Sequence, residues 1–176
     1  MDKSKSNLGF RLMALTFNVR DFFAPRINIL KEVGIKQGFH VLDYGCGPGS
    51  YILPLAEIVG RSGKIYALDM HPAAIKMVKN LALKKKVTNI ETIHSDCKTG
   101  LLDSSLDVVL LYDTLHDLSE PDKVLQELHR VLKPTGVLSI SDHHMKEVEI
   151  VSRLTKTGLY KISTRGKKTY TSLRAT

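Results

Sequence analysis

The chain has 176 residues, of which 43% are hydrophobic and 25% are charged. This length and balance are typical of one globular domain with its own core, and they exclude a disordered polypeptide. We therefore expect a single domain over residues 1–176. No uninterrupted apolar run reaches the roughly 20 residues that a membrane span requires, so we expect a cytoplasmic protein.

The formal net charge of +8 is concentrated near the C-terminus. Residues 151–176 contain no acidic side chain. Their basic residues are Arg153, Lys156, Lys161, Arg165, Lys167, Lys168 and Arg174. A basic surface can bind nucleic acid, but no aromatic interleaving or RNA-binding motif accompanies this one. A solvated face is the commoner explanation, so a nucleic-acid partner is not expected.

Cysteine usage excludes two further classes of site. The two cysteines, Cys46 and Cys97, form neither a disulfide framework nor the spacing of a zinc site. We expect both to be small, partly buried thiols in a reducing compartment.

Strand-like and helix-like segments alternate along the chain. Short β-rich runs are separated by segments whose apolar residues recur at helical spacing. The expected strands cover 40–45, 63–70, 89–96, 106–115 and 136–144. The expected helices cover 25–34, 50–60, 71–86, 119–136 and 146–158.

Local signals set several of the helix boundaries. Pro72 lies in the first turn of its helix, where a missing N–H costs nothing. Ser119 and Asp122 form a pair like a capping box at the start of the helix over 119–136. Pro134 and Gly136 are expected to end that helix.

The segments LYKIST and KTYTSLRA flank residues 165–167 near the C-terminus, and they suggest an antiparallel hairpin. Together with the strict β/α alternation, this predicts an α/β fold. We expect a Rossmann-like, doubly wound, seven-stranded and mostly parallel sheet that the hairpin closes. Ligands bind such sheets beyond the carboxyl ends of the strands.

The first of these strand ends carries the sequence HVLDYGCGPGS at residues 40–50. Its three glycines let a ligand approach the backbone closely. The third glycine of the dinucleotide fingerprint is replaced by Ser50, and Asp43 beside the turn would repel a pyrophosphate. Asp69 ends the second strand, where a carboxylate can accept both hydroxyls of a ribose. These residues indicate a nucleoside that carries a cation instead of phosphates.

The motif VLDYGCGPG, followed by ALDM at the end of the second strand, resembles the class I S-adenosylmethionine-dependent methyltransferases. The later segment EPDKVLQELHRVLKPTGVLSISD is similar to their small-molecule branch, typified by the methyltransferases of ubiquinone and menaquinone biosynthesis. The resemblance extends from about Phe22 to the C-terminus. It implies S-adenosyl-L-methionine as the cofactor, S-adenosyl-L-homocysteine as the product and a small molecule as the methyl acceptor.

The resemblance implies how the methionine and ribose parts of the cofactor are held. The methionine portion would lie on the backbone of the glycine turn, with Asp43 positioning its amino group. Asp69 would bind the ribose hydroxyls. Tyr112, at the end of the fourth strand, would lie near the methionine and the sulfonium.

The resemblance also implies how adenine is held. Met70 would pack on the adenine face, and Asp96 would accept the adenine amino hydrogen, with the Cys97 backbone amide at the ring. The implied cofactor-binding set is Asp43, Gly45, Cys46, Gly47, Gly49, Asp69, Met70, Asp96, Cys97 and Tyr112.

Methyl transfer from a sulfonium is an in-line displacement, for which the protein has to align the acceptor and exclude water. A base is required only if the acceptor loses a proton late in the reaction. The candidates are Asp113 and His116 after the fourth strand, and Asp142, His143 and His144 after the fifth. Asp113, Asp142 and His143 could instead ligate a divalent metal, but the matching amide-type oxygen ligand is missing, so no metal is expected.

Two other functions stay open from the sequence. The chain could be an RNA or protein methyltransferase that docks through its basic C-terminal region, or a cofactor-binding module without turnover. Against the first, the Asn-Pro-Pro-Tyr-like loop of base methyltransferases is replaced by YDTLHD. Neither the acceptor nor the oligomeric state is indicated.

The segment DHHMKE after the fifth strand is too short to cover the site. Residues 1–26 are therefore a possible N-terminal lid over a core of residues 27–176. Phe10, Met13 and Phe17 could line one face of that segment.

Overall fold

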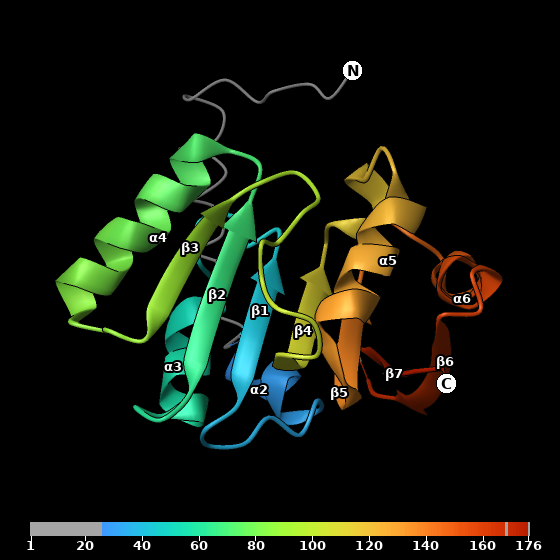
Figure 1. Cartoon of the computed structure of the whole chain (residues 1–176), viewed down its shortest axis with the longest axis horizontal. Coiled ribbons are helices and arrows are strands. Elements are labelled where there is room, and N and C mark those ends of the chain that lie inside the picture. The colour runs from blue at the N-terminus through green and yellow to red at the C-terminus, as the bar shows by residue number, and fades with distance from the viewer. Residues whose placement is uncertain (1–25, 168, 176) are drawn as a thin grey trace.

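One sheet organises the part of the chain that the structure describes. The structure is a computed structural model, and it describes residues 26–167 and 169–175 (Figure 1). These residues form a seven-stranded sheet with the order β3-β2-β1-β4-β5-β7-β6. The proposed N-terminal lid lies outside the described residues, apart from Arg26.

The elements follow the expected alternation. The strands are β1 (His40–Tyr44), β2 (Lys64–Asp69), β3 (Ile90–His94), β4 (Leu106–Tyr112), β5 (Leu132–Ser141), β6 (Tyr160–Arg165) and β7 (Tyr170–Arg174). The helices are α2 (Ile27–Lys31), α3 (Ile52–Val59), α4 (Pro72–Lys85), α5 (Pro121–Val131) and α6 (Glu147–Lys156), with a 3-10 turn η1 (Leu115–Asp117).

Strands β1 to β5 are parallel, and β7 is antiparallel to both of its neighbours, β5 and β6. The predicted doubly wound α/β sheet with a C-terminal antiparallel hairpin is therefore confirmed. The chain winds from β1 outward through β2 to β3, then crosses back to β4 beside β1. The carboxyl ends of β1 and β4 therefore flank the topological switch point, where open α/β sheets bind ligands.

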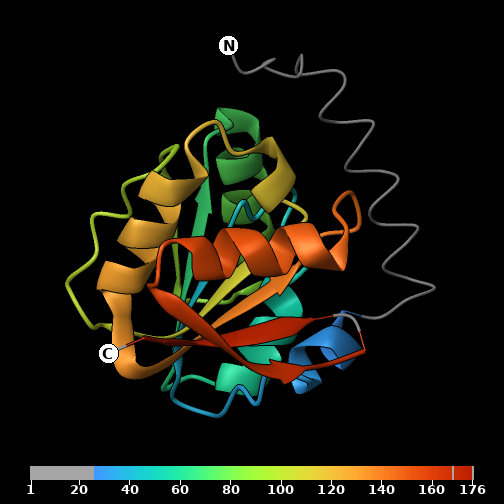
Figure 2. The ribbon, with the colours of Figure 1, turned by 90° about the vertical axis from the view of Figure 1, so that its right-hand side faces the viewer.

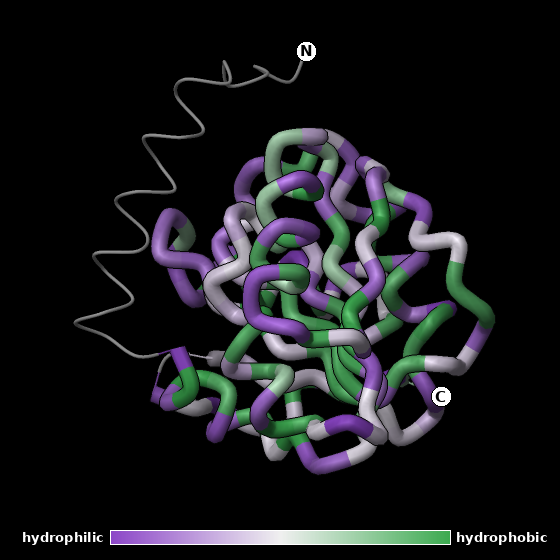
Figure 3. The backbone as a smooth tube through the Cα atoms, turned by 90° about the vertical axis from the view of Figure 1, so that its left-hand side faces the viewer, coloured by the Kyte–Doolittle hydropathy of each residue, from purple (hydrophilic) through white to green (hydrophobic). Residues whose placement is uncertain are grey.

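Helices cover both faces of the sheet (Figure 2). Side chains of successive strand residues point to opposite faces, so β4 supplies two cores. Val108 and Leu110 pack in the cluster with α2, α3 and α4, whereas Val109 and Leu111 pack in the cluster with α5 and α6. Figure 3 shows the hydrophobic strands running through the interior of the described chain.

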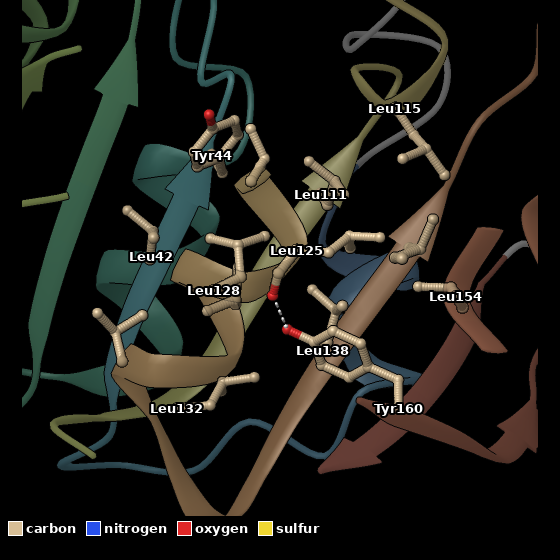
Figure 4. Close-up of a cluster of buried hydrophobic side chains, with 14 of the residues drawn as sticks. Leu42, Tyr44, Leu111, Leu115, Leu125, Leu128, Leu132, Leu138, Leu154 and Tyr160 are labelled. Atoms are coloured by element: carbon tan, nitrogen blue, oxygen red, sulfur yellow. Dashed lines mark hydrogen bonds between the residues drawn. The ribbon is translucent and has the colours of Figure 1, made fainter. Parts of the chain in front are cut away.

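The α5 side of the core is built from leucines (Figure 4). Leu125 and Leu128 of α5 are fully buried against the sheet, because apolar residues recur at helical spacing along α5. The buried Tyr160 hydroxyl donates a hydrogen bond to the Leu125 carbonyl oxygen over 3.0 Å. This contact joins β6 to α5 and fixes the C-terminal hairpin against the core.

The helix expected over 119–136 is shorter than the sequence pattern predicts. It starts at Pro121 without a side-chain cap and ends at Val131, so Pro134 and Gly136 do not end it. The next residues already pair with β4, where Leu106 aligns with Leu132. The register then shifts before Val108, which absorbs the extra residues of β5 around the proline.

Candidate functional site

A cavity of about 360 Å³ lies beyond the carboxyl ends of β1, β2 and β4. The arrowheads of these strands reach the same edge of the sheet (Figure 1). Its volume is within the range of small-molecule sites. The residues of the sequence-predicted set that line it are Asp43, Gly45, Cys46, Gly47, Asp69, Met70, Asp96, Tyr112, Asp113, His116 and His143.

The glycine turn packs tightly on one side and is open on the other. A Cβ on Gly45 would lie 2.3 Å from the Thr114 hydroxyl oxygen, so the turn cannot accept a side chain there without moving. Gly47, in contrast, has a φ of +51° and no neighbour within 4 Å of the place of a Cβ. A ligand can therefore approach the backbone at Gly47.

The amides of this turn are already used within the protein. The amides of Gly45 and Cys46 both donate to the Leu68 carbonyl oxygen, over 2.8 and 2.9 Å. The Gly47 amide donates to Asp69 Oδ2 over 2.9 Å. A pyrophosphate needs such amides to be free, and here they bind β2 instead.

Asp43 is a buried carboxyl group with an incomplete set of partners. The residue is only 2% exposed, and its Oδ2 atom has no hydrogen-bond partner. Burial, with a smaller contribution from the nearby Asp69, raises the pKa of Asp43 to about 7. A cationic group of a ligand would provide the missing partner.

Asp69 is oriented by two backbone amides. Its Oδ2 accepts from the Gly47 amide, and its Oδ1 accepts from the His71 amide over 2.8 Å. Each carboxylate oxygen has two lone pairs, so both can still accept a hydroxyl. Because side chains alternate along a strand, Asp43 and Asp69 lie on the same face of the sheet, next to the turn.

Tyr112 lines the cavity with its ring. Its hydroxyl lies 2.8 Å from Ser139 Oγ inside the core, so it faces away from the cavity. Its ring meets the ring of Tyr51 edge to face at a centroid distance of 5.0 Å. Tyr112 therefore offers a ligand an aromatic surface and no hydrogen-bonding group.

The part of the cavity predicted for adenine is only partly formed as expected. Met70 is 40% exposed and lines the cavity, as does Asp96, whose carbonyl oxygen accepts the Tyr44 hydroxyl over 2.8 Å. Cys97 does not line the cavity, and its amide donates to Ser95 Oγ over 3.3 Å. Gly49 also lies outside the lining, because its Cα faces the side chains of α4.

A carboxylate and an imidazole form a pair on the β4–β5 side of the cavity. The Asp142 side chain is fully buried, and its Oδ2 lies 2.9 Å from Nδ1 of His116. The same carboxylate accepts the backbone amides of His116 and His144, each over 3.1 Å. A buried carboxylate facing Nδ1 favours the tautomer with its proton there, which leaves Nε2, 3.5 Å from Asp117 Oδ2, as the nitrogen that can accept a proton.

A second carboxylate and imidazole pair lies closer to solvent. Nδ1 of His143 is 2.6 Å from Asp113 Oδ1, and the His143 side chain is 64% exposed. Asp113 has a φ of +48°, and its amide donates to the Ser141 carbonyl oxygen over 2.7 Å, which joins the ends of β4 and β5. The imidazoles of His116, His144 and His143 follow one another, with centroid distances of 4.4 and 3.8 Å.

Comparison with known proteins identifies the family. Residues 35–174 match a family model described as a methyltransferase domain. The chain belongs to this methyltransferase family.

The chain is also similar in sequence to curated methyltransferases. It is 30% identical over 113 residues to the demethylmenaquinone methyltransferase of Geobacillus stearothermophilus, covering 64% of this chain and 48% of that protein. It is 29% identical over 125 residues to a ubiquinone/menaquinone biosynthesis C-methyltransferase of Pseudoalteromonas translucida, covering 68% and 49%. The methyltransferase thus spans about half the length of the curated relatives it matches.

A solved structure matches over almost its full length. The crystal structure of an S-adenosylmethionine-dependent methyltransferase from Aquifex aeolicus aligns with a TM-score of 0.78 and 27% identity. The alignment covers 93% of this chain and 98% of that one. The resemblance to the class I methyltransferases of the quinone-biosynthesis type, predicted from the glycine motif and from residues 120–142, is confirmed.

S-adenosylmethionine is the cofactor of this family. The residues of the cavity fit its chemistry. Asp43 has a buried oxygen without a partner, which suits an ammonium group. Asp69 has lone pairs for two hydroxyls, and Gly47 leaves its backbone open to a ligand.

The methyltransferase cavity also contains residues that the sequence did not indicate. They are Tyr44, Pro48, Ser50, Tyr51, Leu68, His71, Ser95, Thr114, Asp117 and Leu118. Most directly neighbour a predicted site residue in the chain, so extending each motif by one position would have found them. Asp142 was noticed only as a possible base or metal ligand, and its pairing with His116 joins two separate loops.

The described part of the methyltransferase shows no metal cluster and no membrane helix. Within residues 26–167 and 169–175, no three His, Cys, Asp or Glu side chains lie close enough to hold a metal ion. Asp113 pairs with His143 and Asp142 pairs with His116, which separates the ligands of the alternative metal site. No helix in these ranges is long and apolar enough to cross a membrane.

Proposed function

We propose that this protein transfers the methyl group of S-adenosylmethionine to a small-molecule acceptor by in-line displacement. One observation carries the proposal: a single cavity contains both the unpartnered carboxyl group of Asp43 and the imidazole of His116. The first suits a cationic cofactor, and the second suits a proton leaving an acceptor. Two curated relatives are named demethylmenaquinone methyltransferase and ubiquinone/menaquinone biosynthesis C-methyltransferase, and these names support a small molecule as the acceptor.

The cofactor supplies an electrophilic methyl group on a sulfonium. Asp43 would hold the amino group, and Asp69 would hold the ribose hydroxyls, since both carboxyl groups line the cavity. The rings of Tyr51 and Tyr112 would keep water from the reacting atoms, since both are buried and line the cavity.

His116 would act as the base. As the nucleophilic atom of the acceptor bonds to the methyl carbon, the carbon–sulfur bond would break and its electron pair would stay on sulfur. The acceptor proton moves to Nε2 of His116, and Asp142 stabilises the imidazolium through Nδ1. The products are the methylated acceptor and S-adenosylhomocysteine.

The two alternative functions receive less support from the described residues. Two of the basic residues offered as a docking surface have partners within the protein. Arg165 forms an ion pair of 2.5 Å with Glu147, and Arg174 donates to the Leu132 carbonyl oxygen over 2.6 Å. A module without turnover would not need an imidazole held by a buried carboxylate beside the cofactor.

A thermal shift experiment with S-adenosylmethionine, S-adenosylhomocysteine and NAD tests the cofactor. A ligand at a hundred times its Kd adds ~2.7 kcal/mol to the free energy of unfolding, which raises Tm by roughly 5–10 °C. We expect this shift with the first two compounds and none with NAD. A shift with NAD alone would overturn the proposal. Transfer of a labelled methyl group to a panel of small acceptors then tests turnover.

A further inference from the structure

A second hollow adjoins the cofactor cavity. It has a volume of about 500 Å³, and we call it the α6 groove. Its lining residues are His116, His144, Met145, Val148, Glu149, Ser152 and Arg153. Because His116 and His144 line both hollows, the α6 groove meets the cofactor cavity at these two rings.

The groove lies where a methyl acceptor would contact the proposed base, His116. The base has to touch the acceptor on the side away from the cofactor, because the nucleophile attacks the methyl carbon in line with the breaking bond. The His116 side chain is 24% exposed and lines the α6 groove as well as the cavity. An acceptor lying in the groove would therefore lie beside the His116 ring, where the groove meets the cofactor cavity.

The groove is apolar near the histidines and charged farther along α6. Met145 is partly buried and Val148 is 69% exposed, and both line the groove. Ser152 lies one helical turn beyond Val148, and Arg153 lies one turn beyond Glu149, because residues four apart are neighbours on a helix. The groove thus offers two apolar side chains near the histidines, and both an acid, Glu149, and a cation, Arg153, farther along α6.

Arg153 forms no ion pair or hydrogen bond with the described residues. Arg130, in contrast, is paired with Glu127 over 2.7 Å, and Arg165 and Arg174 also have partners. The nearest acid on the helix face is Glu149, one turn earlier. Its Oε2 accepts the Lys146 amide over 2.8 Å at the start of α6, so this carboxylate is already engaged.

We propose that the α6 groove binds the methyl acceptor and that Arg153 recognises a carboxylate on it. This inference rests on the proposed function and names the acceptor class: a small, partly apolar acid with its nucleophile at one end and its carboxylate at the other. The guanidinium of Arg153 can donate two parallel hydrogen bonds to such a group. Met145 and Val148 would contact the carbon skeleton between the two ends.

The titratable groups around the reacting end are His116 and its partner Asp142, His144, Glu149, and Asp117, whose Oδ2 lies 3.5 Å from Nε2 of His116. Asp117 and Glu149 are acids, so they oppose an anionic acceptor. Glu149 stands between the histidines and Arg153 along the helix. Removing its charge should therefore help an acid to bind, which gives a variant with an effect opposite to that of Arg153→Ala.

The test uses hydroxylated benzoic acids, each paired with its neutral methyl ester. Labelled methyl transfer is measured for the wild type, R153A, R153K and E149Q. We expect the wild type to prefer the acids, and R153A to lower kcat/KM for the acids about 10-fold, mainly through KM. R153K should keep part of the preference, and E149Q should raise it about twofold. The esters should be unaffected in each variant.

A matched control removes a nearby charge without touching the groove. Lys156 lies on α6 and is exposed, but it does not line the groove. If K156A lowers kcat/KM for the acids as much as R153A does, the effect is general electrostatic attraction and the inference is wrong. Equal losses for acid and ester in R153A would also overturn it.

If the enzyme methylates none of the acids or esters, their binding to the protein is a second measurement. Each acid and ester is titrated into the protein saturated with S-adenosylhomocysteine, with the same variants. Acid binding that is weakened in R153A supports the inference. Absence of acid binding in a protein that binds S-adenosylhomocysteine would overturn the inference and leave the proposed function standing. Failure to bind S-adenosylhomocysteine would overturn the proposed function itself.

Discussion

Two buried aspartates at the same edge of the sheet differ in how many partners they have. Asp43, near the end of β1, is 2% exposed, and its Oδ2 has no hydrogen-bond partner. Asp142, after β5, is 6% exposed, yet it accepts hydrogen bonds from the amides of His116 and His144 and lies 2.9 Å from Nδ1 of His116.

The different numbers of hydrogen-bond partners give the two aspartates different roles in the site. A carboxylate with every partner in place rigidly holds another side chain, so Asp142 positions a base. A buried carboxylate without a partner lowers the stability of the ligand-free protein, because its charge is desolvated. A protein can keep such a group where a bound ligand supplies the missing hydrogen-bond partner. Asp43 therefore indicates where the cofactor binds.

The largest effect is expected at the base that Asp142 holds. Replacing His116 by Gln keeps a hydrogen-bonding group near Asp142 but removes the proton acceptor. Turnover of any acceptor that loses a proton should fall about 100- to 1000-fold, with little change in the Kd of S-adenosylhomocysteine. The matched control is H143Q, in the more exposed pair, which should have a much smaller effect. Comparable losses in both variants would contradict the assignment.

The next effect concerns Asp142 itself. An Asn there removes the buried charge that faces three donors, and its amide nitrogen would oppose one of them. We expect the free energy of unfolding to fall by about 2–3 kcal/mol and turnover to fall about 10- to 100-fold. Urea denaturation and methyl-transfer rates measure the two losses. An unchanged stability would mean that the Asp142 contacts are not formed.

The same substitution at Asp43 should change stability in the opposite direction. Asp43→Asn removes a buried charge without a partner, so at pH 8 we expect the ligand-free protein to gain on the order of 2–3 kcal/mol. Binding of S-adenosylhomocysteine should weaken about 10-fold, because the partner of its ammonium group is lost. A stabilised variant with undiminished affinity would remove Asp43 from the cofactor site.

A smaller effect per pH unit follows from the raised pKa of Asp43, which burial and Asp69 move from 3.8 to about 7. Between these pH values the folded protein retains a proton that the unfolded chain has lost. The stability of the wild type should therefore fall, relative to D43N, as pH rises from about 4 to 7, and change little above. Urea denaturation of both proteins across this range measures the difference. Parallel curves would contradict the raised pKa.

Much of the fold could be predicted because its signals are local. The glycine turn, Pro72 at the start of α4, and Gly60 after α3 lie where the sequence placed them. The end of α5 could not be predicted in this way. Pro134 and Gly136 are helix-ending residues, but pairing of Leu132 with Leu106 ends the helix earlier, and such pairing depends on the assembled sheet.

Some residues of the candidate site could likewise be predicted from local sequence, and others could not. Asp43 and Asp69 could be found because they precede or end strands beside the glycine turn. The pairing of Asp142 with His116 could not, because it joins loops that are 26 residues apart in the chain. Gly49 and Cys97 belong to the motifs that suggested them, but Gly49 packs against α4 and Cys97 packs against the core on the α5 side, and neither lines the cavity.

We expect the ammonium group of a cationic nucleoside to be the missing partner of the Asp43 carboxyl group, and calorimetry at pH 6.5 tests this most directly. S-adenosylhomocysteine is titrated into the wild type and D43N, in buffers that differ in ionisation enthalpy. An ammonium beside Asp43 would lower the pKa of its carboxyl group, so we predict that the wild type releases a large fraction of a proton on binding and that D43N does not. Equal proton release in the two proteins would contradict the claim.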